Sequence, residues 1–311
     1  MTSITPLAVA RLRTLMDEPD LTGTRYRLEG RLGEGGMGEV FLVRDTTLDR
    51  EAALKVVRAG EGSTSNLATR LGIEARLLAR LEHPGIVPVH DAGVLPDGRA
   101  FYVMKYVRGA RLDDWVRAAP GAPGQAPALP ARLRLFGKIC EAVAWAHAQG
   151  IVHRDLKPEN VMVGTFGEAL VMDWGVGRAR ETQEGPGRIV IGTPGYMSPE
   201  QARGELAAVD ERSDIWALGR ILDFLLDDGR RAPAMVSILR RAGAERPEER
   251  YAAVKDLAED VERFQDGLPV SAHRENLLER VGRVLRRNRE LAWLVAAYLA
   301  MRVLLLILAQ R

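Results

Sequence analysis

The chain has 311 residues, of which 46% are hydrophobic and 28% charged, with a formal net charge of +2. This composition is typical of a globular protein with one large domain or two ordinary ones, and it excludes a disordered chain. The near-neutral charge gives no global field that would favour nucleic acid as a partner. The single cysteine, Cys140, cannot form an internal disulfide and continues an apolar helical pattern, so we expect a buried thiol in a reducing compartment.

The front of the chain predicts a small antiparallel sheet with one helix. Residues 1–25 hold one short helical pattern and no secretory signal, and we interpret them as an N-terminal extension. Beyond them, apolar runs of strand length are separated by short turns, and one stretch repeats leucines at helical spacing. The expected strands cover 26–32, 39–44, 51–57, 87–90 and 101–104, and the expected helix covers 67–81.

The sequence pattern changes from strand-like to mostly helical after about residue 106. Residues 118–130 are rich in proline and glycine and predict a flexible surface loop. From Leu133 onward the apolar pattern is mostly helical. A sheet-rich front followed by a larger helical part predicts an α+β protein with a hinge near residues 105–109.

A glycine-rich turn joins the first two expected strands. It carries the pattern G-x-G-x-x-G-x-V from Gly33 to Val40. Dinucleotide-binding folds use the same spacing, but there the turn opens a helix, whereas here a strand follows. Within a hairpin the pattern predicts a backbone flap whose amide N–H groups face phosphate oxygens.

Lys55 lies near the end of the third strand and could be an ordinary solvated residue. Glu74, however, lies on the side of the following helix that carries Leu71 and Leu78, where a lone carboxylate would be costly unless paired. A Lys55–Glu74 ion pair satisfies both groups and aims the ammonium at the α- and β-phosphates of a nucleotide. Glu82 is a weaker candidate because it lies at the end of the helix.

The strongest signal is the polar segment from His153 to Asn160, with Asp173 thirteen residues beyond it. Asp155 could accept a hydrogen bond from a substrate hydroxyl, and Lys157 could neutralise a transferring γ-phosphoryl group. Asn160 and Asp173 offer the hard oxygen ligands that Mg²⁺ prefers. We expect His153 to pack rather than to shuttle protons. A solvated charged turn is the alternative interpretation, which the fixed spacing of all these motifs disfavours.

Together these motifs resemble the bacterial eukaryotic-like (Hanks-type) serine/threonine protein kinase family. The resemblance covers residues 26–267 and implies a two-lobed α+β fold, with a small lobe over about 26–106 and a shortened large lobe over about 107–267. It implies transfer of the γ-phosphoryl group of ATP, with Mg²⁺, to serine or threonine hydroxyls of protein substrates. Lys157 is the residue type that marks the serine/threonine class.

The resemblance also assigns roles to individual residues. Val40, Ala53 and Met162 would enclose the adenine, Met104 would be the gatekeeper, and the backbone of 105–107 would hydrogen-bond the base. Catalytic residues would be Asp155, Lys157, Lys55 and Glu74, and the metal would bind Asn160 and Asp173. The nucleotide set would be Leu32, Gly33, Glu34, Gly35, Gly36, Met37, Gly38, Val40, Ala53, Lys55, Met104, Val107 and Met162.

Three segments downstream extend the resemblance. Residues 192–200 match the segment that positions the peptide substrate, with Ser198 where the family often has alanine. Asp214 would brace the backbone of the catalytic loop. The resemblance also implies an ion pair between Glu200 and Arg250.

The sequence departs from the family at three places. Trp174 replaces the usual phenylalanine, and we expect it to pack equally well. Hydroxyl groups are few between Asp173 and Glu200, and Thr182 is the only obvious site outside the peptide-positioning segment for an activating phosphate, which Arg154 would bind. Only 35 residues separate Asp214 from Arg250, where the family usually has more chain, including a helix that docks substrates and partners. This shortening leaves a catalytically weak nucleotide-binding scaffold as the alternative function, which the intact motifs disfavour.

The C-terminal end predicts a membrane anchor. Residues 280–289 hold five arginines and no acid, and 291–309 are apolar apart from Arg302. As a helix these 19 residues would span roughly 28 Å, close to the bilayer core of about 30 Å. We expect a basic juxtamembrane segment over 268–290, a single transmembrane helix over 291–309, a cytoplasmic kinase domain and no outer sensor domain. A buried terminal helix is the alternative.

Overall fold

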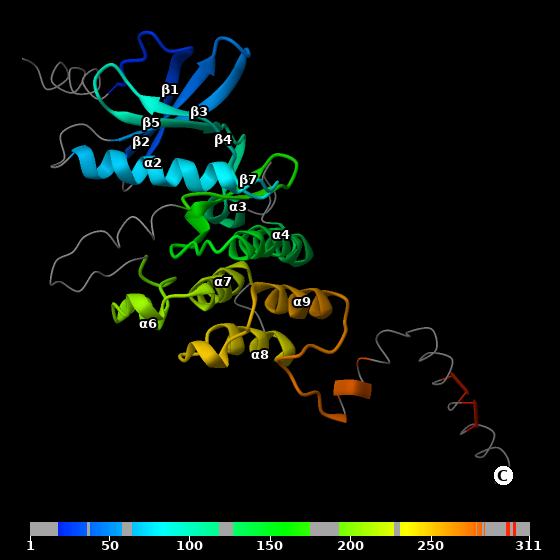
Figure 1. The fold of residues 1–311 in the computed structure, drawn as a ribbon. Helices are drawn as coiled ribbons and strands as arrows, with labels where there is room; N and C mark the ends of the chain where they lie inside the picture. Colours follow the sequence, from blue (N-terminus) through cyan, green and yellow to red (C-terminus); the bar gives the residue numbers. More distant parts are fainter. Residues whose placement is uncertain are drawn as a thin grey trace, which may run out of the picture.

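A computed structural model describes residues 18–35, 38–57, 64–117, 127–174, 193–226 and 231–277, with a few positions beyond them. Within these ranges a small lobe with a five-stranded sheet is joined to a larger helical lobe, so the expected two-lobed α+β architecture is confirmed (Figure 1). The helix expected in 1–25 lies outside the described residues, as does most of 291–309. No helix in the described ranges is long and apolar enough to cross a membrane.

The small lobe is built on one antiparallel sheet with the strand order β1-β2-β3-β5-β4. Its register places Lys55 opposite Val40 on one side and Tyr102 on the other, while Ala53 pairs with Met104. The register therefore brings positions from three strands into one band. The strands are β1 (Tyr26–Gly35), β2 (Gly38–Asp45), β3 (Arg50–Val57), β4 (Val89–Val94) and β5 (Ala100–Lys105).

Both faces of this sheet are covered. On one face Tyr26, Phe41 and Leu54 belong to a separate apolar cluster. The other face packs against α2 (Thr64–Arg80), which lies between the sheet and the helical lobe (Figure 1). Because Leu71 and Leu78 fix the inner side of α2, Glu74 between them is carried into the interior with 0% exposure.

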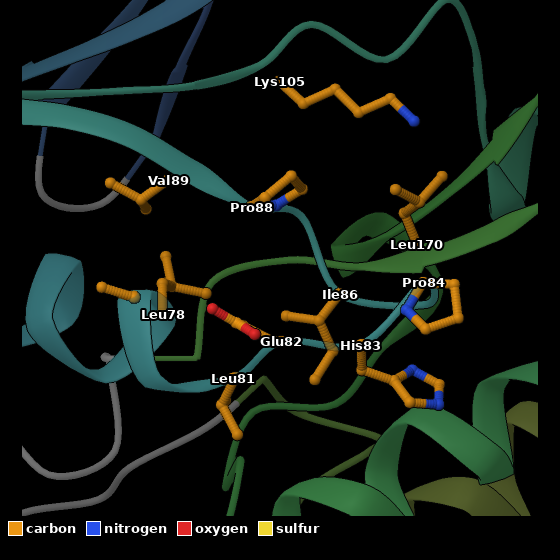
Figure 2. Close-up of a pocket in the computed structure, with 11 residues that line it drawn as sticks. Leu78, Leu81, Glu82, His83, Pro84, Ile86, Pro88, Val89, Lys105 and Leu170 are labelled. Carbon is orange, nitrogen blue, oxygen red and sulfur yellow. The ribbon is translucent and has the colours of Figure 1, made fainter.

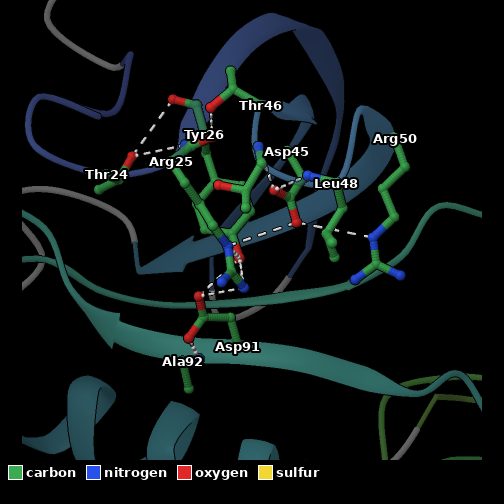
Figure 3. A network of polar contacts seen from close by, with 10 residues as sticks. Thr24, Arg25, Tyr26, Asp45, Thr46, Leu48, Arg50, Asp91 and Ala92 are labelled. Atoms are coloured by element: carbon green, nitrogen blue, oxygen red, sulfur yellow. Dashed lines mark hydrogen bonds and ion pairs between the residues drawn. The ribbon is translucent and has the colours of Figure 1, made fainter.

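A polar network anchors the start of the sheet (Figure 3). The Arg25 guanidinium lies 3.0 Å from the Asp91 carboxylate and 3.6 Å from that of Asp45. The Tyr26 hydroxyl donates to Asp91 at 2.8 Å. These contacts join the beginning of β1 to the end of β2 and to β4, and β1 begins at Tyr26, as the sequence predicts for the first strand.

The large lobe combines a small sheet, ordered β6-β7-β8, with a set of helices around one apolar core. Cys140 is buried within that core at 1% exposure, as predicted. The elements are β6 (Gly109–Arg111), α3 (Leu112–Arg117), α4 (Leu129–Ala148), η1 (Pro158–Asn160), β7 (Val161–Gly164), β8 (Ala169–Val171), α6 (Pro199–Ala202), η2 (Leu206–Ala208), α7 (Glu211–Leu225), α8 (Pro233–Ala242), η3 (Pro247–Glu249) and α9 (Val254–Gln265).

The large lobe is short between α7 and α8. Helix α7 ends at Leu225 and α8 begins at Pro233, so only residues 226–232 connect them. Seven residues are fewer than an ordinary helix of about 11 residues requires. The short interval between Asp214 and Arg250 includes this connection, which we call the α7–α8 link.

Candidate active site

Lys55 of β3 joins the two lobes electrostatically. Its Nζ lies 2.9 Å from Glu74 Oε1 of α2 and 2.8 Å from Asp173 Oδ1, which follows β8. The predicted Lys55–Glu74 pair is therefore present, and both partners are buried. Burial would lower the pKa of Lys55, but the Asp173 and Glu74 carboxylates raise it well above its usual value. The Lys55 charge in turn lowers the pKa of Asp173 against the effect of burial.

Tyr102 of β5 is a member of this cluster that the sequence analysis missed. Its hydroxyl donates to Glu74 Oε1 at 2.9 Å, and the Lys55 ammonium lies 5.6 Å from the centre of its ring. Burial and the neighbouring Glu74 carboxylate raise the pKa of Tyr102 well above its usual value, so the hydroxyl stays a neutral donor. A tyrosine in an apolar strand is usually a core residue, so the sequence pattern alone does not indicate that its hydroxyl bonds to Glu74.

Asp155 lies at the centre of a second polar cluster. Lys157 Nζ is 3.2 Å from Asp155 Oδ2, and the Thr193 hydroxyl donates to Asp155 Oδ1 at 3.1 Å. Lys157 also donates to the Thr193 hydroxyl at 2.7 Å. The Asn160 amide nitrogen donates to the Asp155 carbonyl at 2.8 Å. The structure thus brings the predicted Asp155, Lys157 and Asn160 together and adds Thr193, which the sequence had placed only in the peptide-positioning segment.

The backbone of this catalytic loop is held from both sides. Asp214, 1% exposed, accepts hydrogen bonds from the backbone N–H groups of His153 and Arg154, each at 2.8 Å. The Gln201 side-chain amide donates to the Arg154 carbonyl at 2.7 Å. Arg154 has a φ of 70°, a left-handed conformation that is costly for a residue other than glycine. The buried hydrogen bonds on both flanks offset this cost and fix the peptide that precedes Asp155.

Ser198 orients Gln201. The Ser198 hydroxyl and backbone N–H both donate to Gln201 Oε1, at 3.0 and 3.1 Å, so the amide nitrogen is turned toward Arg154. An alanine at this position would keep the backbone donor and lose the hydroxyl. The departure from the family at Ser198 therefore adds a hydrogen bond behind the catalytic loop.

Glu200 and Arg250 form the expected ion pair. Two guanidinium nitrogens of Arg250 lie 2.8 Å from the two carboxylate oxygens of Glu200, and the Ser213 hydroxyl donates at 2.7 Å. Burial would raise the pKa of Glu200, but the hydrogen bonds from Arg250 and Ser213 lower it to about 2. The pair joins α6 to the segment after η3.

Trp174 packs as expected for an aromatic residue at this place. It is 1% exposed, and its ring centre lies 4.7 Å from that of His153. The indole N–H donates to the Val171 carbonyl at 3.1 Å. His153 is itself fully buried and contacts the Met172 carbonyl at 2.8 Å, which agrees with a packing role.

Three residues of the predicted nucleotide set, Met104, Val107 and Met162, belong to one apolar cluster. Val107 and Leu170 form a small apolar cluster with the partly buried Met104 and Met162 packed against it. Gly38 must be glycine, because a Cβ there would lie 2.0 Å from a backbone oxygen of β3. Gly36 and Met37 lie outside the described residues, as does Thr182.

The donor set fits a magnesium nucleotide. Asn160 uses its amide nitrogen on the loop backbone, which leaves its oxygen for a metal, and Asp173 offers the carboxylate oxygen that Lys55 does not engage. Within the described ranges no group of three or more His, Cys, Asp or Glu side chains could hold a metal ion. Two protein oxygens suit Mg²⁺, which takes its other ligands from phosphates and water.

A cavity of about 420 Å³ lies beside the hinge and is distinct from these positions (Figure 2). Lys105 and Glu82 line it, but none of the residues of the predicted nucleotide set does. It is therefore not the predicted nucleotide site. Its lining residues come from the end of α2, the segment before β4 and the hinge: Leu78, Ala79, Leu81, Glu82, His83, Pro84, Ile86, Pro88, Val89, Lys105 and Leu170.

Comparisons with known proteins agree with this geometry. Residues 26–234 match the family described as protein kinase domain. The chain is 33% identical over 297 residues to the serine/threonine-protein kinase PknD of Chlamydia felis, covering 79% of this chain and 31% of PknD. It is 41% identical over 217 residues to the serine/threonine-protein kinase PknB of Mycobacterium leprae, covering 67% of this chain and 33% of PknB. The chain thus spans about a third of the length of these relatives.

A solved kinase-domain structure also matches this chain. The kinase domain of PknI from Mycobacterium tuberculosis matches with a TM-score of 0.59 and 26% identity, over 79% of this chain and 98% of that domain. Use of ATP and Mg²⁺ is a general property of the family, and the donors around Lys55 and Asp173 fit both. The chain belongs to the protein kinase domain family, among its bacterial serine/threonine (Hanks-type) members.

Proposed function

We propose that this chain transfers the γ-phosphoryl group of ATP to serine or threonine hydroxyls of proteins. The proposal rests on one observation: the Lys55 cluster and the Asp155 cluster are both present in the same structure. Lys55 reaches Glu74 and Asp173 across the two lobes, while Asp155 is held beside Lys157 and Thr193. An isolated nucleotide-binding module would need the first cluster but not the second.

Each residue has a chemical task in this transfer. Asp155 accepts a hydrogen bond from the substrate hydroxyl and orients its oxygen for in-line attack on the γ-phosphorus. Lys157, 3.2 Å from Asp155, stabilises the negative charge on the transferring group. Lys55, held by Glu74, binds the α- and β-phosphates. Bound Mg²⁺, held by Asn160 and Asp173, would neutralise phosphate charge.

Phosphate transfer from labelled ATP to a generic protein acceptor tests this activity. We expect incorporation on serine and threonine but not on tyrosine, and a loss of at least about 100-fold in Asp155→Asn, because that variant removes the base and keeps the size of the side chain. Asp49→Asn makes the same chemical change at an exposed position and is the matched control. Equal incorporation by the wild type and Asp155→Asn would contradict the proposal and favour the scaffold function.

We also propose that the chain is anchored to the cell membrane by residues 291–309, with its kinase domain in the cytoplasm. The support is the apolar run interrupted only by Arg302 and the arginine-rich flank before it. Most of this stretch lies outside the described residues. Deletion of 291–311 should move the protein from the membrane fraction to the supernatant. A deletion variant that still sediments with membranes would contradict the anchor.

A further inference from the structure

One oxygen of Glu74 is shared by two donors from neighbouring strands. Glu74 Oε1 accepts from Lys55 Nζ and from the Tyr102 hydroxyl, each at 2.9 Å. Lys55 and Tyr102 are direct cross-strand partners in the β3–β5 ladder, so their side chains project from the same face of the sheet. The two strands therefore present a paired cation and hydroxyl to a single carboxylate on α2.

Within the described part of the chain, the Tyr102 hydroxyl contacts one carboxylate, whereas the Lys55 ammonium contacts two. Lys55 is divided between Glu74 and Asp173, so its hold on α2 depends on where Asp173 lies. Of the two carboxylates that contact Lys55, it is Glu74 that accepts a hydrogen bond from the Tyr102 hydroxyl. Glu74 is fully buried, and its second oxygen has no hydrogen-bond partner among the residues that the structure describes, so each remaining donor matters more.

We infer that Tyr102 is a positioning residue for the phosphoryl transfer, acting through Glu74. Its hydroxyl ties α2 to the central strands independently of Lys55, and keeps the Glu74 carboxylate where it can aim the lysine ammonium at the nucleotide. The role rests on the proposed kinase function. It deepens that function by naming a third member of the Lys55–Glu74 pair.

A matched control for this role is present in the large lobe. The Tyr251 hydroxyl donates to the Asp260 carboxylate at 2.9 Å, and Tyr251 is 0% exposed where Tyr102 is 1% exposed. Tyr102→Phe and Tyr251→Phe therefore each remove one buried hydroxyl from one carboxylate. A purely structural effect should be similar in the two variants, whereas a positioning effect should appear only in Tyr102→Phe.

Steady-state kinetics with saturating MgATP and peptide test the inference, with urea unfolding of each variant in parallel. We expect kcat to fall about 10-fold in Tyr102→Phe, equivalent to about 1.4 kcal/mol of transition-state stabilisation, and less than about twofold in Tyr251→Phe. The two variants should lose comparable stability. In a Glu74→Gln background, which changes the shared acceptor, adding Tyr102→Phe should lower kcat less than about twofold further.

Three outcomes would overturn the inference. In an active wild type, equal losses of kcat in the two tyrosine variants would reduce Tyr102 to a structural residue. Full additivity of Tyr102→Phe with Glu74→Gln would show that the tyrosine does not act through the carboxylate. A wild type that transfers no phosphate would overturn the proposed function and this role with it, and that result is distinguishable because it precedes any comparison of variants.

Discussion

The buried pair of Glu200 and Arg250 predicts an unequal loss of stability when either partner is removed. Removing one member of a buried ion pair costs about 3–5 kcal/mol, because the other charge is left without its partner. Glu200→Gln leaves the Arg250 guanidinium bonded to three backbone carbonyls, those of Arg212, Ala244 and Glu245, at 2.8–3.2 Å. We therefore expect a cost near the lower limit, about 3 kcal/mol.

The opposite variant, Arg250→Met, should cost more. It removes both guanidinium donors from the Glu200 carboxylate, which is 1% exposed, and it also leaves the three carbonyls without the guanidinium. We expect about 5 kcal/mol. The double variant should cost about 5 kcal/mol rather than the sum of the two, because the second change no longer breaks a pair.

Urea unfolding at pH 7 measures these costs, and pH adds an independent check. The pKa of Glu200 is lowered from 4.5 to about 2, so its contribution to stability is fully present above pH 4.5 and is lost as the pH falls toward 2. The difference between wild type and Glu200→Gln should stay constant from pH 5 to 8 and shrink at pH 3.5. Equal costs of the two single variants, or an additive double variant, would refute the reasoning.

Three other predictions concern the catalytic loop and the core. Ser198→Ala removes the hydroxyl that orients Gln201, and we expect kcat to fall by about threefold to tenfold with a stability loss of only about 1 kcal/mol, measured by kinetics and urea unfolding. Trp174→Phe keeps an aromatic ring against His153, so kcat should change less than about threefold, whereas Trp174→Ala should cost about 3–5 kcal/mol in unfolding. Burial raises the pKa of the Cys140 thiol far above its usual value, so a disulfide reagent at pH 8 should label it only after unfolding in guanidinium.

The site residues that the sequence predicted are charged or amide residues that occur at fixed spacings within the motifs. Lys55, Glu74, Asp155, Asn160 and Asp173 each carry a charge or amide that is costly to bury without a partner, so the pattern of residue types was itself informative. The structure places them in two clusters, one of Lys55, Glu74 and Asp173 and the other of Asp155 and Asn160, a division that the sequence did not predict.

Tyr102, Thr193 and Gln201 could not be predicted in the same way. Each is an uncharged polar residue that is common in strands, turns or helices, and each acts on a partner far away in sequence. Tyr102 meets Glu74 across 28 positions, Thr193 meets Asp155 across 38, and Gln201 meets Arg154 across 47. Such contacts depend on strand register and on helix packing, which hydrophobic periodicity does not determine.

The bounds of strand β4 could not be predicted from the apolar pattern either. The valines at 87 and 89 predicted a strand over 87–90, but β4 runs from Val89 to Val94. Val87 is buried before the strand begins, and Val94 at its end is 68% exposed. The extent of β4 is set by its hydrogen bonds to β5 and not by burial, so an apolar pattern places it two to four residues too early.

The same geometry shows why the short α7–α8 link need not impair the chemistry. Asp214 lies in the first turn of α7, where it holds the catalytic loop, and the link follows Leu225 at the other end of the helix. Eleven residues of helix separate the two, roughly 16 Å along its axis. Asp214 is fixed by His147 and by the loop it braces, none of which belongs to the link. A change at the link therefore acts near the C-terminal end of α7, away from the contacts through which Asp214 supports Asp155.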